Sequence, residues 1–134
     1  MKLPPLRWLD RSVVFGLCTT LCTSEAMFNR VFRSMCKGVP PEWCRPGKAC
    51  VHTVEIPDQT PAMYVCIDAH HKNVLGNPML AAAMLAHEAV HVKQCLMETI
   101  GEDKPSDEFE AYVIQNVVHG LLEEYHRQVF GSPT

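Results

Sequence analysis

Residues 85–91, with the sequence Leu-Ala-His-Glu-Ala-Val-His, constrain this chain more than any other stretch. They lie inside a segment, 79–100, that contains neither glycine nor proline. Pro78 precedes the segment and Gly101 follows it. Proline near the start of a helix and glycine just past its end are typical, so we predict one helix over 79–100.

The two histidines in this helix and the acid between them form a candidate metal site. Residues four apart lie on one face of a helix, so the imidazoles of His87 and His91 can bind the same ion. Zinc binds imidazole readily, and a catalytic zinc keeps one of its four positions for water. Glu88 lies beside that position and can take a proton from the water. This pattern predicts a zinc-dependent peptidase with Glu88 as general base; an amphipathic helix with two solvated histidines is the alternative.

Length and charge limit the other function classes. A chain of 134 residues is expected to form one domain, 1–134. Its net charge of -3 gives no basic surface, so nucleic acid is not an expected partner. No run of 18 apolar residues occurs, so we expect no membrane span. The apolar stretch 13–18, which follows Lys2 and Arg7, imitates a signal peptide only faintly, and we interpret it as folded structure.

Seven cysteines stand at positions 18, 22, 36, 44, 50, 66 and 95. An odd number without a C-x-x-C pair is atypical of a secreted disulfide framework. We therefore expect reduced, mostly buried thiols in a cytoplasmic protein. Cys44 and Cys50 flank a turn sequence at 45–48 and are candidates for a disulfide or a minor metal site, although their spacing fits no standard zinc pattern.

The remaining patterns predict an α+β fold. Apolar residues recur at helical spacing in 25–36, after a Thr-Ser-Glu cap. The run 50–56 alternates and the run 63–67 is rich in β-branched and aromatic residues, so a turn at 57–61 would join them as an antiparallel pair. An exposed edge of this pair could align an extended peptide substrate. A loop at 68–77 then leads into the helix of the two histidines.

The two ends of the chain are predicted as follows. Residues 1–11 form an extended arm whose Trp8 and Leu9 pack onto the body of the protein. Residues 13–22 are ambiguous between strand and helix. A last helix, capped by Ser106 or Asp107, runs over about 107–128 behind a wide apolar face.

A catalytic zinc needs a third protein ligand, and we expect it from the start of the last helix. The candidates are Asp107, Glu108 and Glu110. Helical spacing places Glu110 on the apolar face and Glu108 near the polar side. A carboxylate among apolar neighbours is costly unless it is paired or bound to metal, and this argument alone favours Glu110. Candidate donors to the oxyanion are Tyr112, His119 and the loop histidines His70 and His71.

Two strands, a His-Glu-x-x-His helix, a short turn and a helix with an early glutamate resemble the minimal core of the gluzincin metallopeptidases. The resemblance covers roughly 49–128, which leaves 1–48 as an amino-terminal arm, helix and loop. It implies a zincin-like domain with a small antiparallel sheet packed on helices. Many gluzincins carry the third zinc ligand in a Glu-x-x-Ala motif, which Glu108 would begin here, with Glu110 as the alternative or as a neighbour of the ligand. Tyr112 stands where that family usually has Asp or Asn.

The wider pattern, Gly-Leu-Cys-Thr at 16–19 and Glu-Ala-Tyr at 110–112, is also similar to small metallopeptidase-like proteins of tailed bacteriophages. This similarity implies a place in the host-cell cytoplasm or in the virion, with other phage structural proteins as possible partners. A toxin or immunity-type regulator that cleaves a single host protein is a further hypothesis, which nothing in the sequence distinguishes from a general peptidase. Two classes of function therefore stay open. One is a zinc-dependent peptidase that hydrolyses a peptide or protein; the other is a non-catalytic assembly or virion component on a metallopeptidase-like fold.

Overall fold

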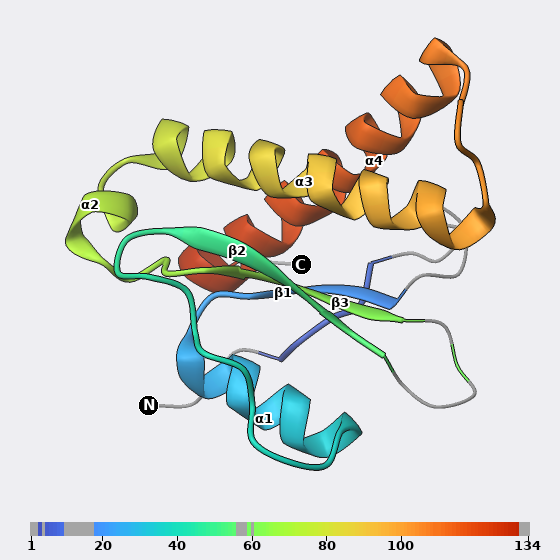
Figure 1. The fold of residues 1–134 in the computed structure, drawn as a ribbon. Helices are drawn as coiled ribbons and strands as arrows, with labels where there is room; N and C mark the ends of the chain where they lie inside the picture. Colours follow the sequence, from blue (N-terminus) through green and yellow to red (C-terminus); the bar gives the residue numbers. More distant parts are fainter. Residues whose placement is uncertain (1–2, 4, 10–17, 56–58, 60, 132–134) are drawn as a thin grey trace.

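The computed structural model describes residues 3, 5–9, 18–55, 59 and 61–131. Within these residues, three strands and four α-helices follow one another, and the last helix ends in a short π-helical segment (Figure 1). Their bounds are β1 (Cys18–Cys22), α1 (Glu25–Met35), β2 (Ala49–Val54), β3 (Ala62–Ile67), α2 (Lys72–Leu75), α3 (Pro78–Ile100), α4 (Asp107–His126) and η1 (Arg127–Gly131). The predicted α+β class is confirmed. The apolar stretch 13–17 and most of the turn at 57–61 lie outside the described residues.

The strands form one sheet in the order β1-β3-β2. The predicted antiparallel pair is confirmed, with Cys50 opposite Cys66 and Thr53 opposite Met63. The pattern at 13–22 left strand and helix open; β1 is a strand that pairs with β3 in parallel, so the sheet is mixed rather than wholly antiparallel. Because β3 is the central strand, all six of its residues are buried, whereas β2 lies at an edge and is only half-buried.

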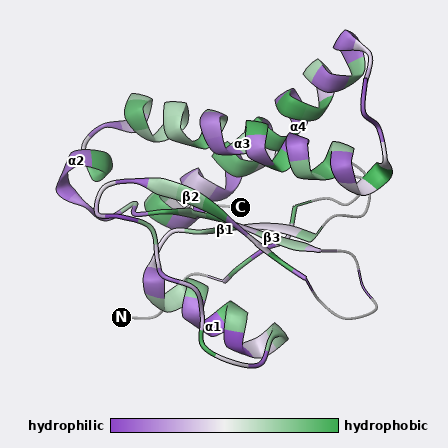
Figure 2. Ribbon diagram, viewed as in Figure 1, coloured by the Kyte–Doolittle hydropathy of each residue, from purple (hydrophilic) through white to green (hydrophobic). Residues whose placement is uncertain are grey.

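Helices cover both faces of the sheet (Figure 1). Successive residues of a strand point to opposite faces, and β3 follows this rule. Met63, Val65 and Ile67 join the larger core with α3 and α4, while Tyr64 and Cys66 join a second core with α1. The hydropathy colouring of Figure 2 shows apolar residues mixed with polar ones along α1, α3 and α4, as expected of amphipathic helices that cover a sheet.

Local chemistry sets the ends of the long helices. The side chain of Asn77 accepts a hydrogen bond from the Leu80 N–H, and Pro78 follows Asn77 in the first turn of α3. Gly101 ends α3 with a left-handed φ of 72°, a conformation that glycine adopts without strain. The predicted helix 79–100 is thus confirmed. Ser106 caps α4 through the Phe109 N–H, which confirms one of the two predicted caps.

The loop before α3 and the amino-terminal arm complete the fold. The predicted loop 68–77 contains a short helix, α2, whose cap is the imidazole of His71 rather than a hydroxyl or carboxylate. The amino-terminal arm packs on the body as predicted, because Leu9 is buried and its N–H donates to the Thr19 carbonyl over 2.8 Å. None of the helices in the described residues combines the length and the apolar composition that crossing a bilayer requires.

Candidate metal site and groove

A groove of about 850 Å³ lies between α3 and the edge strand β2. Its α3 wall includes Glu88, His91 and Gln94, and its opposite wall includes Val51 and Thr53 of β2. The sequence places these groups there because β2 is the edge strand and α3 packs against it. Two members of the predicted site, Glu88 and His91, therefore share one concave surface with a strand edge.

Glu88 is the buried member of the predicted site. Only 6% of the residue is exposed, and among the residues that the structure describes no partner forms a hydrogen bond or ion pair with its carboxylate. Burial raises the pKa of the Glu88 carboxyl, and interactions with His87 and His91 act in the opposite direction. The carboxylate oxygens are not among the fully buried polar atoms that lack a partner, so the carboxylate faces the groove that Glu88 lines. A largely buried acid that faces a groove is a candidate functional group.

His87 and His91 are exposed neighbours on α3. Their ring centroids lie 5.0 Å apart, with the ring planes at 72°. When two imidazoles bind the same zinc ion, each with a Zn–N distance of about 2.0–2.1 Å, their ring centroids lie within roughly 6 Å of each other. The rings of His87 and His91 meet that condition. Nδ1 of His91 lies 3.0 Å from Oε1 of Gln94. Since an amide oxygen only accepts, this contact requires the hydrogen on Nδ1, and in that neutral tautomer Nε2 has the lone pair that a metal needs.

The expected third ligand is not beside these imidazoles. Oε1 of Glu110 lies 2.7 Å from Nζ of Lys93, whose side chain is only 13% exposed. Lys93 follows His91 by two positions, about 200° around the helix, so Glu110 is held on the other side of α3. A carboxylate on the apolar face of α4 was expected to be either paired or bound to metal. Glu110 is paired, and its partner is Lys93.

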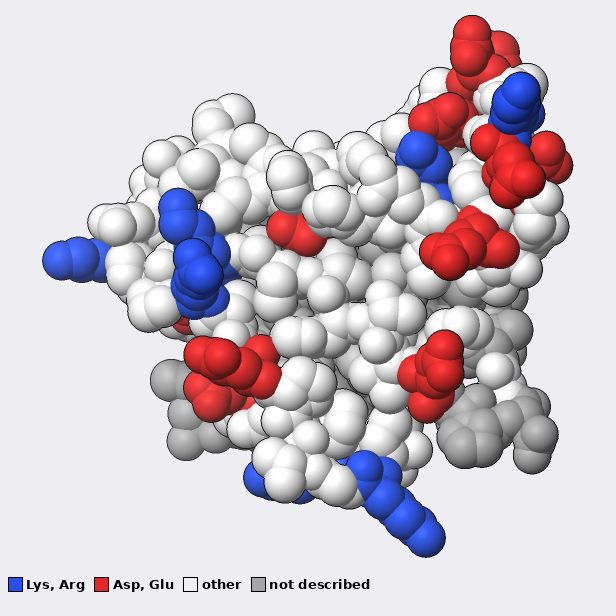
Figure 3. Space-filling view, in the orientation of Figure 1, with Lys and Arg blue, Asp and Glu red and all other residues white. Residues whose placement is uncertain are grey.

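Glu108 and Asp107 are exposed on the first turn of α4. On the face drawn in Figure 3, acidic side chains gather over the turn between α3 and α4. Within the described ranges, the one group of three His, Cys, Asp or Glu residues whose ligand atoms all lie within 4.8 Å of one another does not include His87, His91 or Glu108. The structure therefore places the rings of His87 and His91 side by side on α3 and gives Glu88 and His91 a common groove, which His87 does not line. Glu110 is paired with Lys93 instead.

The candidate oxyanion donors also lie elsewhere. His71 caps α2, and His70 lines a different hollow beside α1. His119 Nε2 lies 3.1 Å from Glu123 Oε1 on an exposed part of α4, and Tyr112 is 58% exposed. The structure describes all four of these residues, and none of them lines the groove of Glu88.

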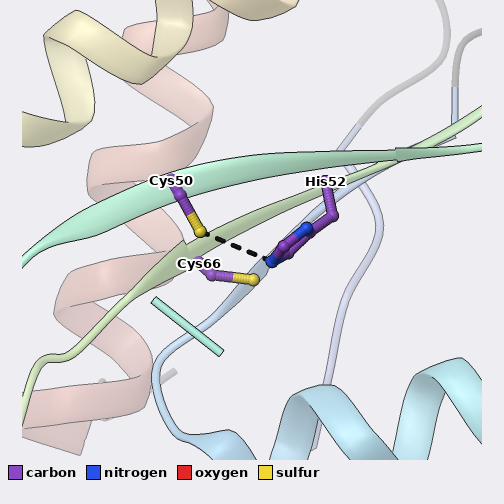
Figure 4. A group of neighbouring side chains, drawn as sticks. All are labelled: Cys50, His52 and Cys66. Carbon is purple, nitrogen blue, oxygen red and sulfur yellow. Dashed lines mark hydrogen bonds between the residues drawn. The ribbon is translucent and has the colours of Figure 1, made fainter. Parts of the chain in front are cut away.

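A second group of possible metal ligands escaped the sequence analysis. Cys50, His52 and Cys66 place their ligand atoms within 4.8 Å of one another (Figure 4). Only the link between Cys44 and Cys50 was considered from the sequence. A usable signal was the Cys-x-His alternation of residues 50–52, which puts both side chains on one face of a strand. The partner Cys66 depends on the register between β2 and β3, and no local pattern reports that register.

No protein-family model matches this chain, and neither the curated proteins nor the solved structures contain a significant match to it. The resemblance to gluzincins and to phage proteins stays a prediction, and the assignment of function depends on the geometry of the site.

Proposed function

We propose that this chain is a zinc-dependent peptidase whose active site is the groove between α3 and β2. The observation that supports the proposal is Glu88, a carboxylate that is buried beside two neighbouring imidazoles and has no partner within the described residues. Burial raises the pKa of the Glu88 carboxyl, and acids with a raised pKa in a concave site are candidates for catalysis. A structural zinc site would not need an acid at this position.

His87 and His91 fit a zinc ion by their spacing and by the free Nε2 of His91. Glu108 is the acid that we assign as third ligand, because its side chain is exposed and forms no ion pair with the described residues, whereas Glu110 is already bound to Lys93. This ligand set requires the first turn of α4 to approach the histidines when the metal binds. Zinc bound in this way supplies a Lewis acid that lowers the pKa of a bound water to about 7.

Glu88 would act as the general base of this reaction. Its carboxylate accepts a proton from the attacking water and then delivers that proton to the leaving amine, so that the peptide bond is hydrolysed with no net change in the enzyme. The burial of Glu88 excludes bulk water from one side of the carboxylate and holds it in one place. Positioning of this kind contributes to catalysis because the base needs no reorganisation during the reaction.

The substrate that suits this groove is an extended peptide. β2 is an edge strand, so no strand of the described residues pairs with one side of its backbone. A peptide can pair with such an edge, and its side chains then alternate between the groove and solvent. Since β2 and Glu88 line the same groove, a peptide bound along β2 would pass over the Glu88 carboxylate.

A non-catalytic role on the same fold is the second candidate, and one observation favours it. Among the described residues no third ligand lies beside His87 and His91, and Glu110 is engaged by Lys93. A virion or assembly component would need neither a complete zinc set nor a free coordination position. The buried and unpaired Glu88 is what this second candidate leaves unexplained.

The two candidates are separated by a cleavage assay on the zinc-loaded chain with a proteome-derived peptide library, in which new amino termini are counted by mass spectrometry. The wild-type chain is expected to cleave, and Glu88→Gln is expected to lose on the order of 10²–10⁴-fold in rate while it keeps its zinc. Glu98→Gln is the matched control, because Glu98 lines the same groove but is exposed. Wild-type zinc-loaded protein that produces no new termini would favour the non-catalytic candidate.

A further inference from the structure

The cluster of sulfur and imidazole groups on β2 and β3 has the geometry of a metal site. Cys50 lies directly opposite Cys66 in the antiparallel pair, and His52 is two residues from Cys50 on the same strand. Figure 4 shows the two thiols and the imidazole directed toward one another from the two strands. Sγ of Cys50 lies 3.5 Å from Nε2 of His52, and all three ligand atoms lie within 4.8 Å of one another.

These separations match those of ligands around one tetrahedral zinc ion. With Zn–S of about 2.3 Å and Zn–N of about 2.1 Å, a tetrahedral angle places sulfur and nitrogen roughly 3.5–3.6 Å apart. The separation of Cys50 Sγ and His52 Nε2 already has this value. Little movement of these two side chains would be needed for them to bind the ion.

Cys44 provides a fourth ligand from the loop that precedes β2. Its side chain is buried, and Cys50 is the neighbour that most raises the pKa of the Cys44 thiol. Cys44 is not a member of the group whose ligand atoms all lie within 4.8 Å of one another, so its thiol would have to approach the other three to bind the same ion. Cys44, Cys50 and His52 line one cavity of about 530 Å³. Three cysteines and one histidine form one of the common structural zinc sets, and a set of four protein ligands leaves no position for a substrate.

The imidazole of His52 is held in place by its surroundings. It stacks on Phe28 of α1 with ring centroids 5.0 Å apart and planes at 24°. The backbone of Glu42 in the loop is near enough to contribute to the raised pKa of His52. Metal-binding histidines commonly have a backbone or carboxylate partner of this kind, which fixes the ring and its tautomer.

We propose that Cys44, Cys50, His52 and Cys66 bind a structural zinc ion on the sheet face that α1 covers. The ion would fasten the loop 36–48, through Cys44, to β2 and β3, and so hold the edge strand that forms one wall of the groove of Glu88. Thiols that bind zinc lose their protons to the solvent, so binding strengthens as the pH rises. The proposal is independent of the proposed peptidase, because these four residues and His87 with His91 share no member.

The test uses the full-length variant His87→Ala/His91→Ala, whose changed residues are exposed on α3 and are not needed for the core. The protein is purified under reducing conditions, dialysed against buffered zinc and analysed for metal by mass spectrometry. One equivalent of tightly bound zinc is expected. Absence of bound zinc in this variant would overturn the proposal, whatever the wild-type chain does as a peptidase.

Replacement of zinc by cobalt identifies the ligands. Thiolate ligands give an intense thiolate-to-cobalt charge-transfer band, which imidazole and carboxylate ligands do not give. The band is expected in the double-histidine variant, lost in the same variant carrying Cys66→Ser, and kept with Cys95→Ser as the matched control, because Cys95 lies outside the cluster. If the Cys66→Ser variant does not fold, the charge-transfer band of the double-histidine variant tests the proposal by itself. Its presence supports thiolate ligands and its absence contradicts them. A disulfide between Cys50 and Cys66 in freshly isolated protein would also overturn the proposal.

Discussion

Nζ of Lys93 lies 2.7 Å from Oε1 of Glu110, and this ion pair joins α3 to α4 on the side of α3 that faces away from the candidate metal site. The Lys93 side chain is mostly buried, so its charge would be costly without an acid beside it. The pair therefore explains why an acid stands on the apolar face of α4. It also distinguishes two neighbouring acids, since Glu110 joins the helices, whereas Glu108 is exposed and forms no ion pair with the described residues.

This separation gives a prediction about the third ligand. Glu108→Gln is expected to weaken zinc binding at His87 and His91 by at least roughly tenfold without changing stability, because an exposed ligand is lost and no contact of the apo protein is broken. Glu110→Gln is expected to cost about 1–2 kcal/mol in the free energy of unfolding, with zinc affinity unchanged. Zinc competition with a chromophoric chelator and urea unfolding measure the two effects. If Glu110→Gln weakened zinc binding and Glu108→Gln did not, Glu110 would be the ligand.

Glu88 is expected to lower the stability of the metal-free chain. The residue is only 6% exposed, and burial raises the pKa of its carboxyl, so Glu88→Gln removes the partial desolvation of a charge. We expect Glu88→Gln to gain about 1 kcal/mol in the free energy of unfolding at neutral pH, in the presence of a chelator. Urea unfolding of both chains provides the measurement, with Glu98→Gln as the exposed control. A loss of stability on this change would mean that the carboxylate has a partner in solution.

The amino-terminal arm and α4 meet at Leu9 and Gly120. A methyl group added at Gly120 would lie 2.9 Å from Cδ2 of Leu9, which is too close. Gly120→Ala is therefore expected to cost about 1–2 kcal/mol, in spite of the better helix propensity of alanine. In a Leu9→Ala background the clash is absent. There Gly120→Ala is expected to raise the free energy of unfolding by up to about 1 kcal/mol. A double-mutant cycle by thermal or urea unfolding tests this reversal of sign; additive effects would contradict the contact.

Gln128 connects the end of the chain to β1 through two buried hydrogen bonds. Its Nε2 donates to the Leu21 carbonyl over 3.0 Å, and its Oε1 accepts from the Thr23 hydroxyl over 2.9 Å. Gln128→Ala leaves both partners unsatisfied, and a loss of about 2–4 kcal/mol is expected. Gln115→Ala, an exposed position of α4, serves as the control and is expected to change stability by less than about 0.5 kcal/mol. Equal effects of the two changes in urea unfolding would show that the bonds contribute little.

The features that local chemistry determines could be predicted from the sequence. Pro78 and Gly101 mark the ends of α3, and Ser106 marks the start of α4, because each acts on the backbone within one turn. The strand pair β2–β3 was also predictable, since a short turn connects its two runs. The helix α2 was missed because its cap is His71, a residue type that seldom serves as one.

The features that depend on contacts between distant residues could not be predicted in this way. The parallel pairing of β1 with β3 joins residues that lie about 44 positions apart, so the mixed character of the sheet left no local signal. A helical wheel places Glu110 on the inner face of α4 but does not report that Lys93 lies opposite it. In the same way, the four ligands of the proposed structural zinc site come from a loop and two strands, and their proximity follows from strand register.

The position of zinc in crystals of the zinc-loaded chain, measured by anomalous scattering at the zinc absorption edge, tests the proposed active site most directly. The account predicts an anomalous peak between the ring nitrogens of His87 and His91, with the Glu108 carboxylate as third ligand and the remaining position open toward Glu88 and the groove. Fully loaded crystals in which no peak lies at these two histidines, or in which their ring nitrogens point away from each other, would contradict it.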